Sequence, residues 1–478
     1  MAEQPLVDHS LIDHSLVDHL LLAAERWPDR PAWTFDPGDG PSATLSFLEV
    51  AQRSAAYAQA LHERGVVPGD RVAVMLDNQP EFPLVWLALM RIGAAMVPLN
   101  VRYRSTDVGH VLTDAGSRIA VTSPSYDDLL DPLTDVVLVE DLAPMGAWAQ
   151  GLVDPDTVVN VQYTSGTTGN PKGCLLTHRY WTTLGTSMLQ EFPHVVTADV
   201  MLTAQPFFYL DPQWNVVTAL LSGAHLVALD GFHPSSFWAK VREHEVTYFY
   251  CLAAMPTLLL RMPPDPLDRA HRVRAVQCSA IPAALHAELE ERWGVAWYEA
   301  FGMTETGADL RVGADDHDEL VGTGCLGRPA AHRQVKLVEG ELWLRGPGMM
   351  EGYLGHHSPF VDGWFPTGDL ARLDEQGRVY LTGRLKDMIR RSGENIAARE
   401  VEDVLLTHPA VRLAAVVGVP DELRGEEVKA YVVAPGAGSA ELDAWCRERL
   451  ADFKVPRFWE FRDDLPLTAS HRVEKAKL

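Results

Sequence analysis

The segment from Tyr163 to Gly173 (YTSGTTGNPKG) has a composition suited to binding a polyphosphate. It contains four serine or threonine hydroxyls, three glycines and Lys172. Glycines allow tight turns that bring backbone N–H groups close to an anion, and the hydroxyls and the lysine add donors and charge. Apolar residues at 158–163 and 174–176 predict a strand on each side, so the segment is a loop between strands rather than a phosphate loop that enters a helix. The alternative interpretation is a glycine-rich surface turn.

Four more motifs follow along the chain, at Tyr298–Glu305, Gly363–Asp369, Gly383–Asp387 and Ser392–Ile396. From about Ser46 to the C-terminus, the ordered set resembles the adenylate-forming superfamily, which includes acyl-CoA synthetases, luciferases and nonribosomal-peptide adenylation domains. The resemblance implies an ATP-dependent acyl-CoA ligase, which activates a carboxylic acid as an acyl-AMP and then transfers the acyl group to CoA. The cofactors and substrates that it implies are ATP, Mg²⁺, CoA and a carboxylic acid.

This reaction requires charge neutralisation, because an anionic acid attacks an anionic α-phosphate. The resemblance implies that the loop grips the β- and γ-phosphates, and that Thr304 and Glu305 hold Mg²⁺ and the α-phosphate. A hard cation prefers such oxygen ligands. Thr164, Lys172 and Glu305 are the residues expected to be catalytic here. The loop residues expected to bind the nucleotide are Thr164, Ser165, Gly166, Thr167, Thr168, Gly169 and Lys172.

The same resemblance assigns residues to the nucleoside. Asp369 is expected to accept hydrogen bonds from the ribose diol, and Arg384 is expected to reach the ribose or the phosphates. Adenine is expected between two segments, with Phe301 as its stacking face. The alternative for Asp369 is the turn that Gly-Asp pairs usually form. The adenine-side residues are Ser279, Ala280, Glu299, Ala300, Phe301, Gly302 and Met303.

The chain departs from the superfamily in its late motif, which normally reads Thr-x-x-Gly-Lys and whose lysine bridges the carboxylate and the α-phosphate. Here Thr468 is followed by Arg472 at the position of the lysine. Arginine keeps the charge but is planar and bulkier, so the exchange is not conservative. Either Arg472 acts as the catalytic cation, or Lys475 or Lys477 replaces it, or adenylation is weak and the enzyme serves one half-reaction. The segment could also be only a solvated basic tail.

A second departure lies in the acid-binding region. Tyr209 stands where many members carry histidine, and the stretch that follows resembles the carnitine and crotonobetaine CoA-ligase branch. The aromatic side chains here, with Phe232, could form a cage for a quaternary ammonium group. We favour a pocket for a bulky or hydrophobic acid, because most ligand pockets are apolar with few polar groups. The expected acyl pocket consists of Phe208, Tyr209, Asp211 and Trp214.

Composition narrows the class of protein. A chain of 478 residues with 47% hydrophobic residues is long enough for several domain-sized units and a substantial core. The net charge of −24 argues against nucleic acid and anionic membrane as partners. Five scattered cysteines, with neither a secretory signal pattern nor a long apolar run, indicate reduced thiols in a cytoplasmic protein. A homodimer is left open.

Alternating strands and helices must position these motifs. Ser46 and Glu49 form a capping-box pattern that starts a helix ending near Arg64, and strands at 71–76 and 94–99 flank a helix at 82–93. This alternation predicts βαβ units and a largely parallel sheet. The expected fold class is α/β plus α+β, with a large multi-sheet N-terminal domain (1–382), a hinge (383–387) and a small, mobile C-terminal α+β domain (388–478).

Lys386 matches the hinge position of the superfamily, in which the C-terminal domain rotates between an adenylating and a thiolating pose. The turn with Gly393 and Glu394 is then expected on the CoA side. The Asp-His repeats of the first 20 residues and the stretch Asp315–Glu319 both suggest metal ligands. A frayed or helical leader and a solvated loop are favoured instead, because a period of five keeps no helix face and consecutive side chains rarely converge on one ion.

Three other functions share parts of this pattern. A nonribosomal-peptide adenylation domain would be followed by a carrier domain, whereas the chain ends at Leu478. A luciferase-type oxygenase shares all the motifs. In a non-catalytic nucleotide- or CoA-binding relative, Arg472 would mark lost chemistry, but the intact loop, Glu305 and Asp369 argue against this.

Overall fold

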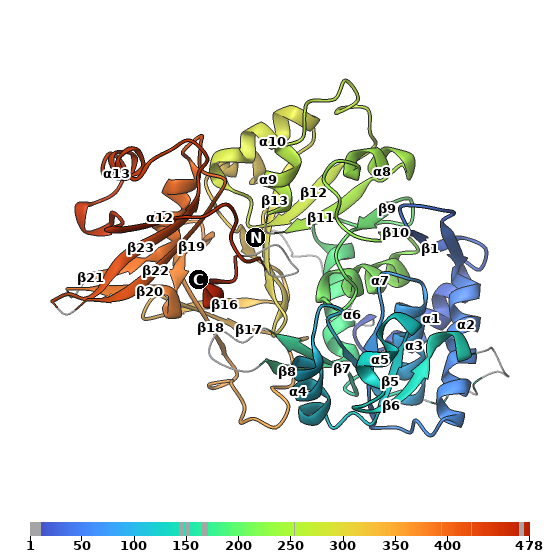
Figure 1. The fold of residues 1–478 in the computed structure, drawn as a ribbon. Coiled ribbons are helices and arrows are strands. Elements are labelled where there is room, and N and C mark those ends of the chain that lie inside the picture. The colour runs from blue at the N-terminus through green and yellow to red at the C-terminus, as the bar shows by residue number, and fades with distance from the viewer. Residues whose placement is uncertain are drawn as a thin grey trace.

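Four β-sheets organise the part of the chain that the computed structural model describes (Figure 1). That part comprises residues 11–142, 148, 151, 153–164, 171–252, 254–392, 394–421, 423–467 and 473–478. Two large sheets precede residue 330, a four-stranded sheet follows them, and the last sheet is formed after residue 387.

A six-stranded sheet carries the phosphate-binding motif. Its order is β6-β5-β3-β4-β7-β8, and neighbouring strands are parallel except for the antiparallel pair β7 and β8. The helix α3 (Glu81–Ile92) joins β3 to β4, which confirms the predicted βαβ unit. The strands are β3 (Arg71–Met75), β4 (Ala95–Pro98), β5 (Ile119–Thr122), β6 (Asp135–Leu138), β7 (Val158–Thr164) and β8 (Lys172–Thr177).

A nine-stranded sheet carries the adenine-side motifs, with the order β15-β14-β13-β12-β11-β9-β10-β1-β2. Its central strands are parallel, and antiparallel pairs stand at both edges. Parallel sheets are usually covered on both faces, so the central strands of this sheet are expected to be buried. The strands are β1 (Pro31–Asp36), β2 (Ala43–Ser46), β9 (Val200–Thr203), β10 (His225–Leu229), β11 (Tyr248–Leu252), β12 (Ala275–Ser279), β13 (Trp297–Met303), β14 (Gly307–Arg311) and β15 (Arg328–Pro329).

One hydrophobic core joins these two sheets to the helices packed on them. It includes residues of α1 (Leu16–Arg26), α2 (Phe47–Glu63), α3, α6 (His178–Gln190) and α7 (Leu210–Ser222). Its polar centre is Asn160 of β7, whose side-chain oxygen accepts hydrogen bonds from the indole N–H groups of Trp86 and Trp181. The predicted capping box of α2 is present, since Ser46 and Glu49 bond each other's backbone N–H.

The N-terminal repeat is partly described. Ser15 caps α1, and Leu16, Val17 and Leu20 of this helix are fully buried. His19 is also buried, and its ring bonds the carbonyl of Leu11. The third repeat unit is therefore part of the core, while residues 1–10 lie outside the described residues.

The last two sheets are antiparallel or mixed. A four-stranded sheet contains β16 (Gln334–Val338), β17 (Glu341–Arg345), β18 (Phe365–Leu373) and β19 (Val379–Arg384). After the short 3₁₀ turn Leu385–Asp387, a five-stranded sheet packs its own core against α12 and α13. In Figure 1 this red and orange unit lies beside the rest of the molecule. Its strands are β20 (Met388–Arg391), β21 (Glu394–Ala397), β22 (Leu413–Asp421), β23 (Gly425–Val433) and β24 (Phe458–Phe461).

The remaining helices are short and cover sheet faces or edges. They are α4 (Ser105–Ala115), α5 (Asp127–Leu130), α8 (Phe237–Glu243), α9 (Met255–Leu260), α10 (His286–Trp293), α11 (His317–Leu320), α12 (Ala398–Leu406) and α13 (Ser439–Arg447). Among the described residues, the helices are too short or too polar to cross a membrane.

Candidate active site

A cavity of about 600 Å³ collects residues from motifs that lie more than 200 positions apart in the sequence. Its walls come from β7, β8, α7, the strands β11 to β14, β18 and the turn after β19. The site residues predicted from the sequence that line it are Thr164, Lys172, Tyr209, Asp211, Trp214, Ser279, Ala300, Phe301, Gly302, Met303, Thr304, Glu305, Arg384 and Lys386.

The phosphate-binding motif spans the antiparallel pair β7 and β8, as predicted. Thr164 ends β7 directly opposite Lys172, which begins β8, and both line the cavity. Gly173 is required by packing, because a Cβ there would lie 2.6 Å from Val161 Cγ1. The predicted nucleotide-binding residues Ser165, Gly166, Thr167, Thr168 and Gly169 lie outside the described residues.

Thr304 and Glu305 stand at the tip of the β13–β14 hairpin. Gly302 lets the two strands approach, because a Cβ there would overlap the carbonyl oxygen of Gly307. A fully buried ion pair holds the base, with Arg333 Nε 2.6 Å from Asp309 Oδ1. Asp309 also accepts a short hydrogen bond from the Thr306 hydroxyl. These contacts therefore hold the base of the hairpin in place, while the residues of its tip line the cavity.

The carboxylate of Glu305 is half-buried and hydrogen-bonded. The hydroxyl of Tyr353 donates to Glu305 Oε1 at 2.9 Å. Burial raises the pKa of Glu305, although this hydrogen bond and the charge of Arg384 both favour the ionised form. Lys172 Nζ lies 5.3 Å above the ring of the same tyrosine.

Asp369 and Arg384 face each other across β18 and β19. Their Cα atoms are register partners, and Arg384 Nε lies 2.6 Å from Asp369 Oδ1. Asp369 is only 1% exposed and does not line the cavity, whereas its neighbours Thr367 and Gly368 do. The arginine predicted to reach the nucleotide therefore covers the predicted ribose carboxylate.

The adenine-side segments contain one supporting carboxylate as well as wall residues. Glu299 is 4% exposed and accepts hydrogen bonds from the backbone N–H of Ala280 at 2.6 Å and of Ile281 at 2.9 Å. Burial raises the pKa of Glu299 to about 8, against the effect of these two N–H groups. Ala280 and Glu299, predicted to lie on the adenine side, do not line this cavity, and their contact with adenine stays a prediction. Both are needed to shape the turn after β12, where Ala280 adopts a φ of 68°.

One end of the cavity, where the acid is expected, is aromatic and apolar. Tyr209 and Trp214 line it together with Tyr250, Leu184 and Met188. The ring of Trp214 meets that of Tyr250 edge-on, with 5.6 Å between centroids. Asp211, at the start of α7, places an acidic side chain at this end of the cavity.

Of the four aromatic residues suggested as a cation cage, Tyr209 and Trp214 line the cavity, whereas Phe208 and Phe232 do not. Phe208 is buried behind the cavity, 4.7 Å from the ring of Tyr209, and Phe232 packs on Phe237 at 5.5 Å. Neither lines the cavity. The expectation that Phe208 contacts the acid stays a prediction: in the turn before α7 its carbonyl accepts from Gln162, and the residue belongs to the buried core.

Several wall residues carried no signal in the sequence. Tyr353, Tyr250, Gln162 and Arg311 all line the cavity. Tyr250 and Gln162 lie in strands that the sequence marks only as short apolar runs. Such a run does not show which side chains face a cavity. Tyr353 lies in a stretch without regular periodicity, and only its contacts in the folded chain mark it.

The described C-terminal residues expected near the reaction lie outside the cavity. Lys475 Nζ lies 2.7 Å from Glu402 Oε1 and donates to the carbonyl of Val416, and Lys477 pairs with Glu474 at 2.8 Å. Glu394 lies in β21 and pairs in register with Arg391. Neither Lys475 nor Glu394 lines the cavity, while Arg472 and Gly393 lie outside the described residues.

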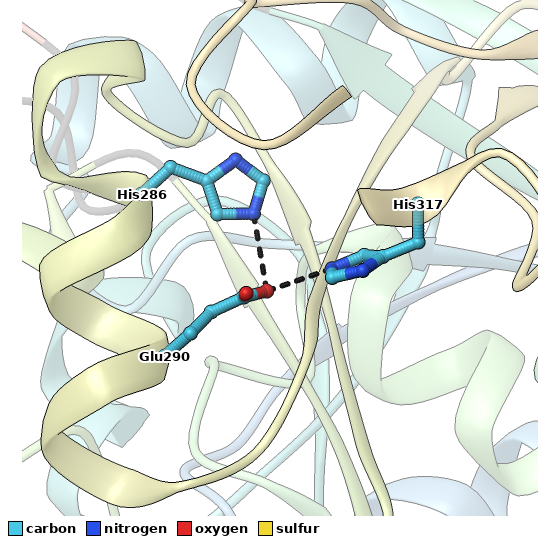
Figure 2. A group of neighbouring side chains, drawn as sticks. All are labelled: His286, Glu290 and His317. Carbon is cyan, nitrogen blue, oxygen red and sulfur yellow. Dashed lines mark hydrogen bonds and ion pairs between the residues drawn. The ribbon is translucent and has the colours of Figure 1, made fainter. Parts of the chain in front are cut away.

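Two histidines and a glutamate converge behind the adenine-side segment (Figure 2). His317 of the acidic stretch 315–319 is buried rather than solvated, and its Nε2 lies 2.7 Å from Glu290 Oε1. His286 Nε2 donates to the carbonyl of Trp297, and its Nδ1 accepts from the N–H of Gly322. His286 Nε2 also lies 3.4 Å from Glu290 Oε1, so Glu290 contacts both histidines in one hydrogen-bond network (Figure 2).

Comparisons with known proteins identify the family of this chain. The AMP-binding enzyme family matches residues 21–354, and the AMP-binding enzyme C-terminal domain family matches residues 400–472. Feruloyl-CoA synthase from an Amycolatopsis species is 33% identical over 467 residues, covering 91% of this chain and 93% of that protein. Crotonobetaine/carnitine–CoA ligase from Proteus mirabilis is 29% identical, covering 95% and 97%.

Solved structures show the same fold. o-Succinylbenzoate CoA synthetase from Bacillus subtilis, in complex with ATP and magnesium ion, has a TM-score of 0.87 and 28% identity, covering 96% of this chain and 98% of that one. Its complex with an acyl-adenylate intermediate gives the same TM-score. The predicted fold class is thus confirmed. With the first family match spanning residues 21–354, the chain belongs to the AMP-binding enzyme family, within the adenylate-forming superfamily.

Proposed function

We propose that this enzyme is an AMP-forming acyl-CoA ligase. It joins a carboxylic acid to ATP with release of pyrophosphate, and CoA then displaces AMP to give the thioester. One observation carries the proposal: a single cavity brings Lys172, Glu305 and Arg384 beside an aromatic and apolar end. The charged end suits a nucleotide polyphosphate, and the apolar end suits the acyl group.

The residues at the hairpin tip fit a magnesium ion. Thr304 and Glu305 offer a hydroxyl and a carboxylate at the cavity wall, and Mg²⁺ prefers oxygen ligands. When bound with ATP, the ion would neutralise charge on the phosphates. Relatives support this choice, since a structure with 28% identity is a complex with ATP and magnesium ion.

The chain's own cations and Asp369 complete the nucleotide site. Lys172 supplies positive charge for the β- and γ-phosphates from the start of β8. Arg384 would move from the carboxylate of Asp369 to the phosphates, and Asp369 would then accept hydrogen bonds from the ribose hydroxyls. Neither charged side chain would be left without a polar partner. Phe301 would provide the stacking face for adenine.

The acid is proposed to be bulky and largely aromatic. Trp214, Tyr250, Leu184 and Met188 form a wall that buries apolar surface. Asp211 would select acids that carry a hydrogen-bond donor, such as a hydroxyl, rather than a second carboxylate. Feruloyl-CoA synthase, named for such an acid, is among the relatives. Phe208 and Phe232 do not line the cavity, so the four-residue cage suggested for a quaternary ammonium acid is incomplete there.

The two half-reactions are proposed to use different arrangements of the C-terminal domain. Lys386 lines the cavity here, whereas Glu394 does not. We assign this arrangement to adenylation, with 383–387 as the hinge between domains 1–382 and 388–478. Rotation about the hinge would bring the turn of Gly393 and Glu394 to the cavity for thiolation.

Arg472 is the cation that we propose for adenylation. Lys475 and Lys477 are both held by carboxylates of the C-terminal domain, which leaves the residue at the motif position as the remaining candidate. An enzyme limited to thiolation of supplied acyl-AMP is the second candidate, because arginine differs in shape and hydration from lysine.

The test is pyrophosphate release across a panel of aromatic, aliphatic and quaternary ammonium acids, with ATP and Mg²⁺, with and without CoA. Release with an aromatic acid, joined by acyl-CoA when CoA is present, is the expected result. If no acid releases pyrophosphate but synthetic acyl-AMP and CoA give thioester, the enzyme is a thiolation enzyme. Failure of both reactions would overturn the ligase proposal.

A further inference from the structure

A short segment, residues 350–354, connects the two charged groups of the nucleotide site. The N–H of Met350 donates to the backbone carbonyl of Glu305, and the N–H of Leu354 donates to the carbonyl of Gly173, next to Lys172. The pairing continues through Gly352 and Leu175. One stretch of backbone is therefore bonded to both the hairpin tip and the start of β8.

Tyr353 projects from this segment between the two charges. Its hydroxyl donates to Glu305 Oε1 at 2.9 Å, and its ring faces Lys172 Nζ at 5.3 Å from the centroid. Both contacts are of favourable types, a hydrogen bond to a carboxylate and a cation over an aromatic face. The tyrosine lines the cavity, so it acts on these groups at the surface where ligand binds.

The position of the ring has a chemical consequence. Lys172 and Glu305 have opposite charges on the same cavity wall, and a direct ion pair would remove both from a ligand. No ion pair joins them in the described part of the chain, because the tyrosine ring lies at one and its hydroxyl at the other. The neutral side chain of Tyr353 therefore contacts both charged groups.

We infer that Tyr353 is a positioning residue for MgATP: its hydroxyl orients the Glu305 carboxylate for the cation, and its ring holds the Lys172 ammonium apart from Glu305. This inference rests on the proposed function, since it assigns Glu305 to Mg²⁺ and Lys172 to the phosphates. It adds a residue that neither the motif pattern nor the order of charged residues identified.

The experiment measures binding rather than turnover. Mn²⁺ serves as the probe in electron paramagnetic resonance titrations, together with the α,β-methylene analogue of ATP, which cannot release pyrophosphate. Tyr353→Phe is expected to weaken Mn²⁺ binding in the presence of the analogue by roughly 10-fold, because a hydrogen bond to a charged group is lost. Tyr353→Leu is expected to weaken binding of the analogue by roughly a further 3-fold, because the cation–π contact is also lost.

Tyr126→Phe is the matched control, since Tyr126 also donates a hydrogen bond to a carboxylate, that of Asp77 at 2.8 Å, and does not line the cavity. It should leave both affinities unchanged. Equal affinities in wild type and Tyr353→Phe, with melting temperatures also equal, would overturn the inference while leaving the ligase proposal intact. A wild type that binds neither probe would overturn the proposed function itself and the inference with it.

Discussion

In the proposed function, the opposite charges of Lys172 and Glu305 serve different parts of one ligand. Under the proposed function Lys172 would face the anionic phosphates, whereas the half-buried Glu305, which accepts from Tyr353, would present oxygen to a cation. A side chain that neutralises charge developing in the transition state is worth much more than a surface ion pair.

Replacing either residue should depress adenylation. We expect Lys172→Ala and Glu305→Ala each to lower pyrophosphate release by roughly 100-fold, the scale of removing one electrostatic contact in an active site. ATP–pyrophosphate exchange with a substrate acid measures this step alone. Glu63→Ala, at the exposed end of α2, is the control and should keep full activity. Exchange rates unchanged in both variants would show that the site has been misassigned.

Arg472 should matter for one half-reaction. We expect Arg472→Ala to lower pyrophosphate release by roughly 100-fold, because the cation bridging acid and α-phosphate is lost, and to leave thioester formation from synthetic acyl-AMP near the wild-type rate. Single-turnover measurements of each half separate the two. Arg472→Lys restores the usual motif residue and should recover adenylation. Equal losses in both halves would refute the assigned role.

The β13–β14 hairpin is the element on which the catalytic tip depends. Its rigidity comes from Asp309 and Arg333, which are both fully buried and 2.6 Å apart. Removing one partner of a buried pair leaves an uncompensated charge, and this costs more than the pair itself contributes.

Arg333→Ala should therefore destabilise the protein by roughly 3–5 kcal/mol, measured by urea unfolding. Arg179→Ala is the matched control, because its pair with Asp156 is exposed and is worth at most about 1 kcal/mol. If the two variants unfold at the same urea concentration, the buried pair does not stabilise the hairpin.

The contact between α10 and α11 should make stability depend on pH. Burial raises the pKa of Glu290, but hydrogen bonds from His286, His317 and the N–H of Trp297 outweigh this effect and lower it to about 2. Burial lowers the pKa of His317, but Glu290 and Asp318 outweigh this and raise it above 6.5. The stabilisation is therefore full between about pH 4.5 and 6.5 and is lost towards pH 2 and above the raised pKa of His317.

The variant His317→Gln tests this predicted dependence of stability on pH. At pH 6 the variant should be less stable than wild type by about 1–3 kcal/mol, the worth of a hydrogen bond between charged groups. The difference should shrink as pH rises past the pKa of His317, because the wild type then loses the same contribution. Thermal unfolding at pH 6 and pH 9 measures it, and a difference that is constant with pH would contradict the assignment.

Sequence reasoning worked best where local chemistry determines structure. The capping box formed by Ser46 and Glu49 begins α2 as predicted. The motif after β7 joins it to the antiparallel strand β8, also as predicted. Sequence reasoning reached less far where long-range packing decides, since Phe208 lies in the core and buried Glu299 accepts a backbone hydrogen bond in the turn after β12. Tyr353 could not be found from its neighbours, because its role comes from residues about 50 and 180 positions away.

At the scale of the whole molecule, the C-terminal sheet has its own core and contacts the rest of the molecule at several described positions. These include Arg261 Nη2 donating to the carbonyl of Arg412, and Gly383, which leaves room for Ala397. A chain with net charge −24 must concentrate its cations where the nucleotide binds. A mobile domain can deliver such cations for one step and withdraw them for the next.

The hinge proposal can be tested at Lys386, in the 3₁₀ turn Leu385–Asp387. Proline fixes φ near the value of such a turn, so Lys386→Pro is compatible with the arrangement in Figure 1 but opposes rotation away from it. We expect pyrophosphate release to stay within a few-fold of wild type, and thioester formation from acyl-AMP to fall by roughly 100-fold, because the CoA-side turn cannot reach the cavity. Lys386→Ala removes the side chain without fixing φ and should retain thioester formation. Loss of pyrophosphate release with thioester formation intact would mean that the arrangement seen here belongs to thiolation, and an equal loss of both in the alanine variant would place the effect in the side chain rather than in the hinge.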